Sequence, residues 1–199
     1  GPQGLRTIAA RIHRLSAILA AGLREAGLEL STAAFFDTLE VELGARTAGV
    51  IEAAAAAGYN LRQVSASRIG LSGDETTTRE DIAAVLTCFG VTSSIEALDA
   101  HVSANGGALP AALLRTDAIL SHPVFNTHHT EHEMLRYLKK LQNRDLALDH
   151  SMIALGSCTM KLNATSEMIP VSWPEFANLH PFVPREQAAG HLEMIEGLA

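Results

Sequence analysis

The chain has 199 residues, of which 47% are hydrophobic and only 5% aromatic, so aliphatic side chains must supply most of its core. A formal net charge of −7, with lysine and arginine scattered, gives no support to nucleic-acid binding, which requires a basic stripe, and no apolar run is long enough to span a bilayer. The two cysteines, Cys88 and Cys158, are typical of a reducing compartment and argue against a disulfide framework.

The first predicted element is a long helix. Apolar residues recur at steps of three and four, which places them on one helix face, and Gly27 follows where a C-terminal cap belongs. This face consists of Leu5, Ile8, Ile12, Leu15, Leu19 and Leu23.

Three short strands and a second helix are predicted next. The stretch "TLEVEL" (38–43) alternates apolar and polar residues, as a strand with one buried face does. Thr47 can start a short alanine-rich helix that Gly58 ends. The stretches "NLRQV" (60–64) and "RIGLS" (68–72) predict two further strands.

A third helix completes the first part of the chain. Thr77 and Glu80 have the spacing of a capping box, and Gly90 closes the helix that follows. Its apolar face consists of Ile82, Val85, Leu86 and Phe89. Residues 1–92 are therefore predicted to form a small α/β domain, a compact sheet with helices packed against it.

A connector with helices is predicted over residues 93–150. A short helix near Ile95–Val102 precedes the turn "NGG", and "SHPVFN" (121–126) is expected to be extended around its proline. Thr130 and Glu133 form a second predicted capping box. The helix that they open has Met134, Leu135, Leu138 and Leu141 on its inner side.

Residues 151–199 combine a polar stretch, several prolines and a last helix bearing Ala188, Leu192 and Ile195, and we interpret them as the beginning of another unit.

The histidine-rich stretch "HHTEHE" (128–133) is a candidate metal site. In a helix, His128 and His132 would stand four residues apart on one face, as two zinc ligands do. A zincin needs His-Glu-x-x-His, however, and Arg136 stands where the second histidine would be required. A polar, capped helix start explains the stretch as well, and we expect no metal.

The stretch "GSCTMK" (156–161) offers a glycine, hydroxyls, a thiol and a lysine. A P-loop requires glycine directly before its lysine, where this chain has Met160, so the nucleotide interpretation fails. An anion site and a plain capped turn both remain open. Cys158 is a nucleophile candidate, but no signature of a cysteine protease surrounds it, which favours a structural thiol.

Long motifs give the chain a resemblance to a known family. The stretches "MIALGSCTMKLNATSEMIPVSWPEFANLHPF" and "LRTDAILSHPVFNTHHTEHEMLRYLKKLQNRDLAL" closely resemble the P-protein of the glycine cleavage system, a glycine dehydrogenase (decarboxylating). The stretches "GPQGLRTIAARIHRL", "FFDTL" and "DETTTRED" agree with it in order, so the resemblance covers nearly the whole chain.

The resemblance implies a fragment. P-proteins are several times longer and consist of two halves, each similar to a fold-type I pyridoxal-phosphate enzyme. Residues 1–92 then correspond to the small C-terminal domain of the first half, residues 93–150 to the connector, and residues 151–199 to the first elements of the second, cofactor-binding half. The absence of a starting methionine and the end inside a helical pattern agree with an internal excerpt.

The activity implied by the resemblance is decarboxylation of glycine on pyridoxal phosphate, with transfer of the aminomethyl group to the lipoyl group of H-protein. The anchoring lysine of the family lies in an Asn-Leu-His-Lys stretch, whereas the "NLH" of this chain (178–180) is followed by Pro181. The anchor is thus expected outside this chain, which alone should be inactive. The implied active-site-lining candidates are Ser157, Cys158, Thr159, Lys161 and Asn163.

The implied partners are glycine, lipoylated H-protein, the remaining part of the P-protein and, in the intact enzyme, further copies of it. Neither nucleic acid nor a membrane is expected as a partner. The implied location is the bacterial cytoplasm, or the mitochondrial matrix for a eukaryotic protein, with the bacterial one favoured. The alternative is a stand-alone, noncatalytic interaction or regulatory module of the same ancestry.

Overall fold

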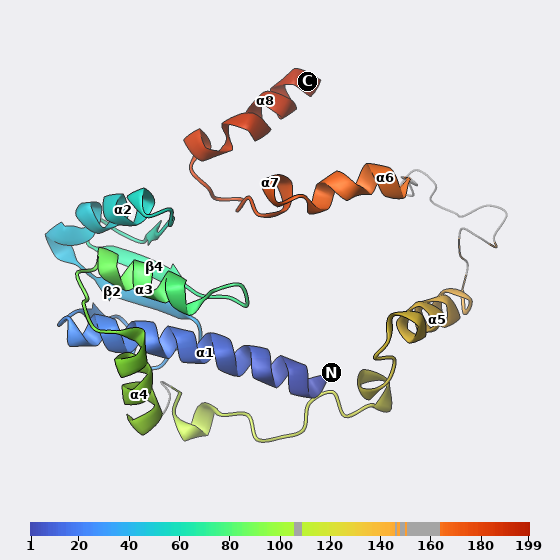
Figure 1. The fold of residues 1–199 in the computed structure, drawn as a ribbon, viewed down its shortest axis with the longest axis horizontal. Helices are drawn as coiled ribbons and strands as arrows, with labels where there is room; N and C mark the ends of the chain where they lie inside the picture. The colour runs from blue at the N-terminus through green and yellow to red at the C-terminus, as the bar shows by residue number, and fades with distance from the viewer. Residues whose placement is uncertain (106–108, 146, 148–149, 151–163) are drawn as a thin grey trace. The chain divides into compact units, whose positions relative to one another are not determined.

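The structure, a computed structural model, contains two compact units, Gly1–Thr127 and His128–Ala199 (Figure 1). It describes every residue except 106–108, 146, 148–149 and 151–163.

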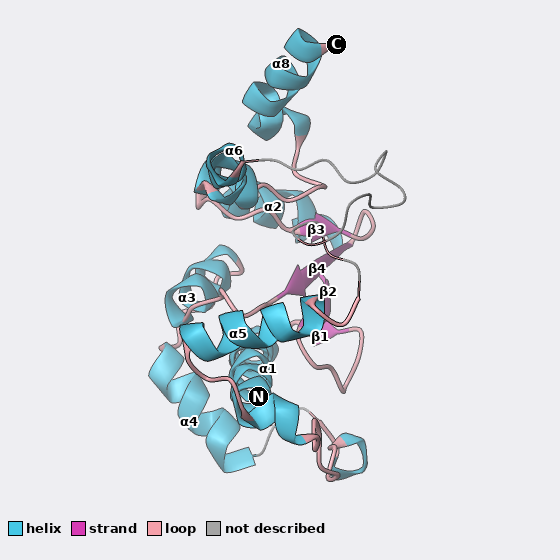
Figure 2. Ribbon diagram, turned by 90° about the vertical axis from the view of Figure 1, so that its right-hand side faces the viewer, coloured by secondary structure: helices cyan, strands magenta, loops and turns pink. Residues whose placement is uncertain are grey.

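The first unit is a mixed α/β structure, as predicted for the start of the chain. Its strands form a four-stranded antiparallel sheet in the order β1-β2-β4-β3 (Figure 2). The strands are β1 (Glu29–Leu30), β2 (Thr38–Glu42), β3 (Arg62–Gln63) and β4 (Arg68–Ser72). The helices are α1 (Pro2–Glu25), α2 (Thr47–Ala56), α3 (Arg79–Cys88) and α4 (Ile95–Asn105), and short 3₁₀ turns cover Gly44–Arg46, Ala111–Leu113 and Pro123–Asn126.

The alternating pattern of the central strands explains the core. In β2 and β4, Leu39 and Val41 pair with Leu71 and Ile69, and all four side chains are buried on one face of the sheet. Helices α1 and α3 contribute further buried side chains, including Leu23 and Leu86, to the same cluster. The predicted strands at 38–43, 60–64 and 68–72 are therefore confirmed, whereas the two-residue β1 was not predicted.

Helix α1 confirms the long helix, but its predicted apolar face is buried only in part. Leu5 is 51% and Ile8 46% exposed, while nearly every residue of the helix from Leu15 to Leu23 is buried, including Ile18, which the spacing did not select. The reason is that the C-terminal half of α1 packs against the sheet and also against α3 and α4. A helix enclosed on several sides buries more than one stripe.

All three helix ends predicted from glycines are confirmed. Gly27, Gly58 and Gly90 have φ values of 74°, 89° and 82°, in the left-handed region that glycine adopts without strain. After α1, the Leu28 N–H donates to the Leu23 carbonyl at 3.0 Å, which closes a Schellman motif.

The capping box of α3 lies one residue later than predicted. The hydroxyl of Thr78, not Thr77, accepts the Asp81 N–H at 3.1 Å, and the Thr78 N–H donates to Asp81 Oδ2 at 2.8 Å. Asp74 explains the shift, because its carboxylate accepts the N–H of Thr77 at 3.1 Å and so holds Thr77 in the preceding turn.

The expectation of an extended "SHPVFN" stretch is wrong for most of its length. His122, directly before the proline, is extended, but Pro123–Asn126 forms a 3₁₀ turn. The Val124 N–H donates to His122 Nδ1 at 3.1 Å, so the histidine side chain caps this turn. Proline restricted the residue before it, as expected, and then served as the first residue of a helical turn.

The second unit is helical in its described part. The capping box of Thr130 and Glu133 at the start of α5 is confirmed in both directions, and the predicted last helix is present as α8. The helices are α5 (Glu131–Gln142), α6 (Thr165–Met168), α7 (Pro174–Ala177) and α8 (Ala189–Leu198), with 3₁₀ turns at Ile169–Ser172 and Arg185–Ala188.

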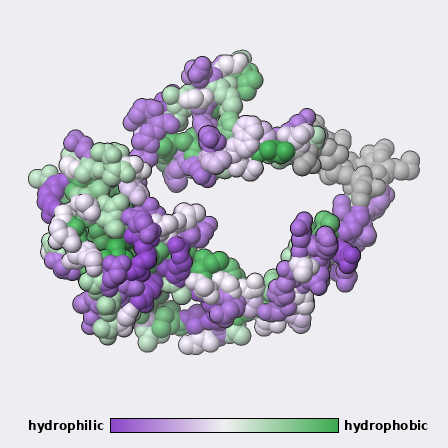
Figure 3. All heavy atoms as spheres, in the orientation of Figure 1, coloured by the Kyte–Doolittle hydropathy of each residue, from purple (hydrophilic) through white to green (hydrophobic). Residues whose placement is uncertain are grey.

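The inner side predicted for α5 is not buried. Met134, Leu135, Leu138 and Leu141 are all exposed, and Ala147 is the one buried hydrophobic residue among the described residues of this unit. Because α6 and α7 have four residues each, the described residues of this unit form no core that could receive the apolar face of α5. Hydrophobic side chains accordingly reach the visible surface of both units (Figure 3).

Candidate functional site

The active-site-lining candidates cannot be placed. Ser157, Cys158, Thr159, Lys161 and Asn163 all lie in the stretch 151–163, outside the described residues. After this stretch, the N–H of Ala164 donates to Glu167 Oε2 at 3.0 Å ahead of α6.

The histidine-rich stretch does not have the geometry on which the metal interpretation rests. Helix α5 begins at Glu131, and His128 precedes it with φ of 63°, so His128 and His132 do not share a helix face. The His128 ring instead stacks on Tyr137, with ring centroids 4.2 Å apart and planes 14° apart. Within the described part of the chain, no three metal-ligating side chains gather.

The "NLH" stretch also has a structural role in the described residues. His180 Nδ1 accepts the Phe182 N–H at 3.0 Å, so this ring closes the turn around Pro181. The ring centroids of His180 and Phe182 are 5.7 Å apart. The resemblance to the anchoring motif therefore ends at the third residue, as the sequence indicated.

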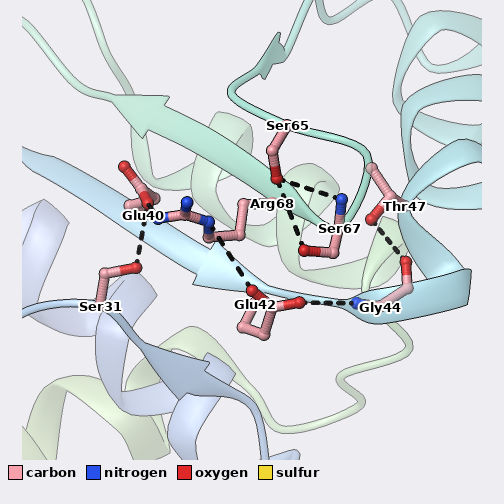
Figure 4. A network of polar contacts seen from close by, with 8 residues as sticks. All are labelled: Ser31, Glu40, Glu42, Gly44, Thr47, Ser65, Ser67 and Arg68. Atoms are coloured by element: carbon pink, nitrogen blue, oxygen red, sulfur yellow. Dashed lines mark hydrogen bonds and ion pairs between the residues drawn. The ribbon is translucent and has the colours of Figure 1, made fainter.

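A polar network covers the outer face of the sheet in the first unit (Figure 4). Arg68 on β4 forms ion pairs across to β2, with Glu40 at 2.5 Å and with Glu42 at 3.8 Å. Ser31 donates to the same Glu40 oxygen at 3.2 Å, and Glu42 accepts the Gly44 N–H at 3.2 Å. Each carboxylate is satisfied within the network, which makes it a cross-strand support for the sheet.

A second polar cluster joins α3 to Tyr59, in the segment that follows α2. The Tyr59 hydroxyl donates to Asp81 Oδ1 at 2.8 Å, while Asp81 also completes the cap with Thr78. Hydrogen bonds from Thr78 and then from Tyr59 lower the pKa of Asp81, and the bond to Asp81 raises the pKa of Tyr59. The carboxylate therefore stays ionised in a structural position.

A hollow of about 560 Å³ lies between α1 and the start of α3. Leu15 and Ile18 lie beneath it and are buried, and its rim carries arginines together with Glu80. It is lined by Ala10, Arg11, Arg14, Leu15, Ile18, Thr78, Arg79 and Glu80.

One carboxylate on α4 serves two of the arginines at this hollow. Arg79 donates to Asp99 Oδ2 at 3.0 Å, and Arg14 Nη2 lies 2.6 Å from Asp99 Oδ1. The second contact is an ion pair without the alignment of a hydrogen bond, because Oδ1 has no aligned donor. Arg79 and then Arg14 hold the pKa of Asp99 below its usual value.

Arg11 is held differently. Its two terminal nitrogens donate to the backbone carbonyls of Glu75 at 3.1 Å and Thr77 at 2.7 Å. No local sequence pattern predicts this hollow, because its lining residues are far apart in the chain. Its signal in the sequence is the spacing of Arg11 and Arg14 beside Leu15 and Ile18 on one helix.

None of the described helices has the length and apolar character needed to cross a membrane.

Comparisons with known proteins agree with the resemblance seen in the sequence. A family model described as "Glycine cleavage system P-protein" matches residues 1–89. The chain is 64% identical over 199 residues to "Glycine dehydrogenase (decarboxylating)" of Dechloromonas aromatica, and 59% identical over 199 residues to the protein of that name from Chromobacterium violaceum. A third relative of that name, from Paraburkholderia phytofirmans, is 55% identical over 205 residues.

These matches cover 100% of this chain but only 21%, 20% and 21% of the respective relatives, so the chain spans about a fifth of their length. Over that fifth, the chain is similar to glycine dehydrogenases (decarboxylating), and its residues 1–89 match the model of the glycine cleavage system P-protein family.

Proposed function

We propose that this chain is a segment of a pyridoxal-phosphate-dependent glycine decarboxylase of the glycine cleavage system. The observation that carries the proposal is the 64% identity to a glycine dehydrogenase (decarboxylating) over the full 199 residues. The intact enzyme would release carbon dioxide from glycine and transfer the remaining aminomethyl group to the lipoyl group of H-protein.

Within that enzyme, residues 1–92 would be the small C-terminal domain of a first fold-type I unit. Residues 93–150 would form the connector and residues 151–199 the first elements of the second half. The mixed α/β character of the first unit and its antiparallel sheet support this assignment.

The described residues do not fit the cofactor as its anchor. An imine requires a lysine beside a cavity, and no lysine lines the hollow between α1 and α3 or the one beside α2 and the end of α3. Lys139 and Lys140 are exposed on α5, and Pro181 follows His180 in the "NLH" stretch. Because the family's anchoring lysine follows Asn-Leu-His and this chain has Pro181 there, we propose that the anchor lies outside this chain and expect the chain alone to be inactive.

The segment around Lys161 is proposed to line the active site of the intact enzyme without anchoring the cofactor. Ser157, Cys158, Thr159 and Asn163 would line it with Lys161. Their support is the sequence resemblance, since they lie outside the described residues.

A chimera tests the proposal. This chain would replace the aligned 199-residue segment of the Dechloromonas aromatica protein, in which every residue of the chain is covered. We expect the chimera to bind pyridoxal phosphate and to release carbon dioxide from glycine only when H-protein is present. A folded, cofactor-loaded chimera without activity would contradict the proposal and favour the noncatalytic module.

Two variants of the chimera test the lining residues. Lys161→Ala and Asn163→Ala should each lower turnover while the imine absorption band remains. Lys140→Ala, which removes an exposed lysine of α5, is the matched control and should leave turnover unchanged. Borohydride trapping of the cofactor on Lys161 would instead make that residue the anchor.

The proposed partners follow from the activity: glycine, lipoylated H-protein, the remainder of the P-protein and a second copy of the intact enzyme. The bacterial sources of the relatives support a bacterial cytoplasmic enzyme.

A further inference from the structure

We propose that the apolar face of α5 is a docking surface for the part of the longer polypeptide that lies outside this chain. This face consists of Met134, Leu135, Leu138 and Leu141. Its docking role rests on the proposed function only in requiring that the chain is a segment of a longer protein. It adds a binding surface to α5, which the proposed organisation places in a connector.

The apolar face is regular and open to contact. Its four side chains lie along one side of the helix and are between 40% and 65% exposed. Arg136 and Lys140 lie on the opposite side. A helix of 12 residues is marginal in water by itself, and in proteins its stability comes mainly from packing of the apolar side. The face of α5 therefore needs a cover.

Helix α5 is well ordered at its start, which favours docking. The Thr130 N–H donates to Glu133 Oε2 and the Glu133 N–H donates to the Thr130 hydroxyl, both at 3.2 Å. The His128 ring stacks on Tyr137 with ring centroids 4.2 Å apart, which ties the preceding residues to the helix. Because these contacts hold the helix in shape, docking loses less conformational entropy than the ordering of a flexible segment would.

The described residues of this chain offer no apolar cover for α5. In the second unit, Ala147 is the one buried hydrophobic residue among those described. In the first unit, one face of the sheet already packs with α1 and α3 in the core, and the outer face carries the ion pairs of Arg68 with Glu40 and Glu42. Neither face of that sheet presents an apolar surface to another helix.

The size of the face favours an occupant in the same polypeptide over a second copy of the chain. Helix α5 is about 18 Å long, and four side chains on it expose on the order of a few hundred Å². Specific association of two separate proteins buries roughly 1,200–2,000 Å², which two such faces do not reach. A partner in the same polypeptide is held at a high effective concentration, so a smaller contact suffices.

The relatives have enough further polypeptide to supply this occupant. They are 64%, 59% and 55% identical to the chain along its whole length, yet the chain spans only 21%, 20% and 21% of theirs. About four-fifths of each relative therefore lies outside the matched segment. We assign the cover of α5 to an apolar groove in that part.

Hydroxyl-radical footprinting with a mass-spectrometric readout tests this assignment, because it measures the solvent exposure of individual side chains. The 199-residue chain is compared with the chimera in which it replaces the aligned segment of the Dechloromonas aromatica protein. We expect strong labelling of Met134 and Leu138 in the chain alone. In the chimera, their labelling should fall to the level of Leu23, which is fully buried, while Arg136 on the opposite side stays labelled in both.

Two variants separate docking from a role within the chain. Leu138→Ser should leave the melting temperature of the 199-residue chain unchanged, because Leu138 is 55% exposed there, and should lower that of the chimera. Lys140→Ser, on the opposite side of the same helix, is the matched control and should change neither. If the chimera does not fold, labelling of the Dechloromonas aromatica protein at its own aligned positions provides the same comparison.

Activity is a separate readout. An inactive chimera whose α5 face is protected would contradict the proposed function and leave the docking surface standing. An active chimera in which Met134 and Leu138 remain labelled would overturn the docking surface alone. Equal protection of Arg136 would also overturn it, because the helix would then be covered on all sides.

Other occupants of the face give different results, each of which would overturn the proposal. Protection in the 199-residue chain that grows with concentration, together with a dimer in sedimentation velocity, would assign the face to a second copy. Protection of that chain at every concentration would assign it to the first unit. Protection that requires phosphatidylglycerol vesicles, in the chimera as in the chain alone, would assign it to a lipid surface.

Discussion

Thr78 and Asp81 cap each other at the start of α3. The Asp81 N–H donates to the Thr78 hydroxyl at 3.1 Å, and the Thr78 N–H donates to Asp81 Oδ2 at 2.8 Å. The Tyr59 hydroxyl donates to the other carboxylate oxygen at 2.8 Å. One ionised side chain thus completes a helix start and ties α3 to the chain that follows α2.

Asp81→Asn should destabilise the first unit at neutral pH by about 1 kcal/mol, because a charge-assisted acceptor at the helix start is lost. The folded pKa of Asp81 lies below its usual value of 3.8, so its stabilisation is present above that pH and is lost as pH falls through the folded pKa. Urea unfolding at pH 7 and near pH 3 should therefore show a difference between variant and wild type that shrinks in acid.

Glu80→Gln is the control for Asp81→Asn, since it makes the same charge change at the neighbouring exposed position. Its effect should be small at both pH values. A stability difference for Asp81→Asn that stays constant from neutral to acid pH would refute the assigned role.

Gly22→Ala should destabilise the first unit by about 1 kcal/mol, although alanine favours a helix. A Cβ at Gly22 would lie 2.7 Å from a methyl group of Leu86 and 3.1 Å from one of Leu98, both in the core. In α2, Gly49 has open space around it, so Gly49→Ala should stabilise by roughly 0.5–1 kcal/mol. The melting temperatures of both variants test whether Gly22→Ala destabilises and Gly49→Ala stabilises. Stabilisation by both would contradict the close approach of α1 to α3 and α4.

Asp99→Asn should weaken the packing of α4 in a salt-dependent manner. Two guanidinium groups would lose their shared carboxylate, at a cost of about 1 kcal/mol in low salt, because both arginines are partly exposed. The difference from wild type should decrease in 1 M salt, where the Debye length is about 3 Å. Asp117→Asn, in an exposed pair with Arg115, is the control and should have little effect. Equal destabilisation by both variants would rule out a special role for Asp99.

Residues 1–105 should be more stable than residues 1–92 by at least about 3 kcal/mol. The longer piece retains α4, whose Ile95, Leu98 and Val102 are buried in the core of the first unit. Urea midpoints of the two pieces give the comparison. Leu98→Ala in the full chain should lose about 2–3 kcal/mol by the same contact. Coincident midpoints for the two pieces would show that α4 is dispensable.

A chelator should not shift the melting temperature of the chain. Metal that binds only the folded form would stabilise it, so its removal would lower the midpoint. His128 stacks on Tyr137 ahead of α5 and does not share a helix face with His132, which leaves the spacing argument for zinc without support. Elemental analysis finding one zinc per chain after dialysis, lost in His132→Ala, would contradict this expectation.

Features set by local chemistry could be predicted from the sequence. A helix end at Gly27 needs only a residue that accepts positive φ, and the box of Thr130 and Glu133 needs only side chains three residues apart. The α3 cap was misplaced because the Asp74 carboxylate accepts the N–H of Thr77, which the predicted capping box assigned to Glu80. The sequence pattern does not show which of these two carboxylates accepts it.

Features set by what packs on an element could not be predicted in the same way. Periodicity predicts both Leu5 and Leu19 on the buried face of α1, yet only Leu19 is buried, because other elements pack around it. The hollow between α1 and α3 is lined by Arg11 from one helix and Arg79 from the other, a combination that no local sequence pattern predicts. For the stretch that contains Lys161, the sequence resemblance is the sole basis of its proposed role.

The two outer strands of the sheet have a consequence for self-association. The edge strands of the sheet are β1 and β3, each two residues long, and both residues of β3 are exposed and polar. An exposed edge strand offers unpaired backbone N–H and C=O groups to other chains. A short edge strand offers few such groups, and charged side chains on it discourage pairing. At high concentration, the first unit should therefore resist the strand-by-strand polymerisation that leads to fibrils.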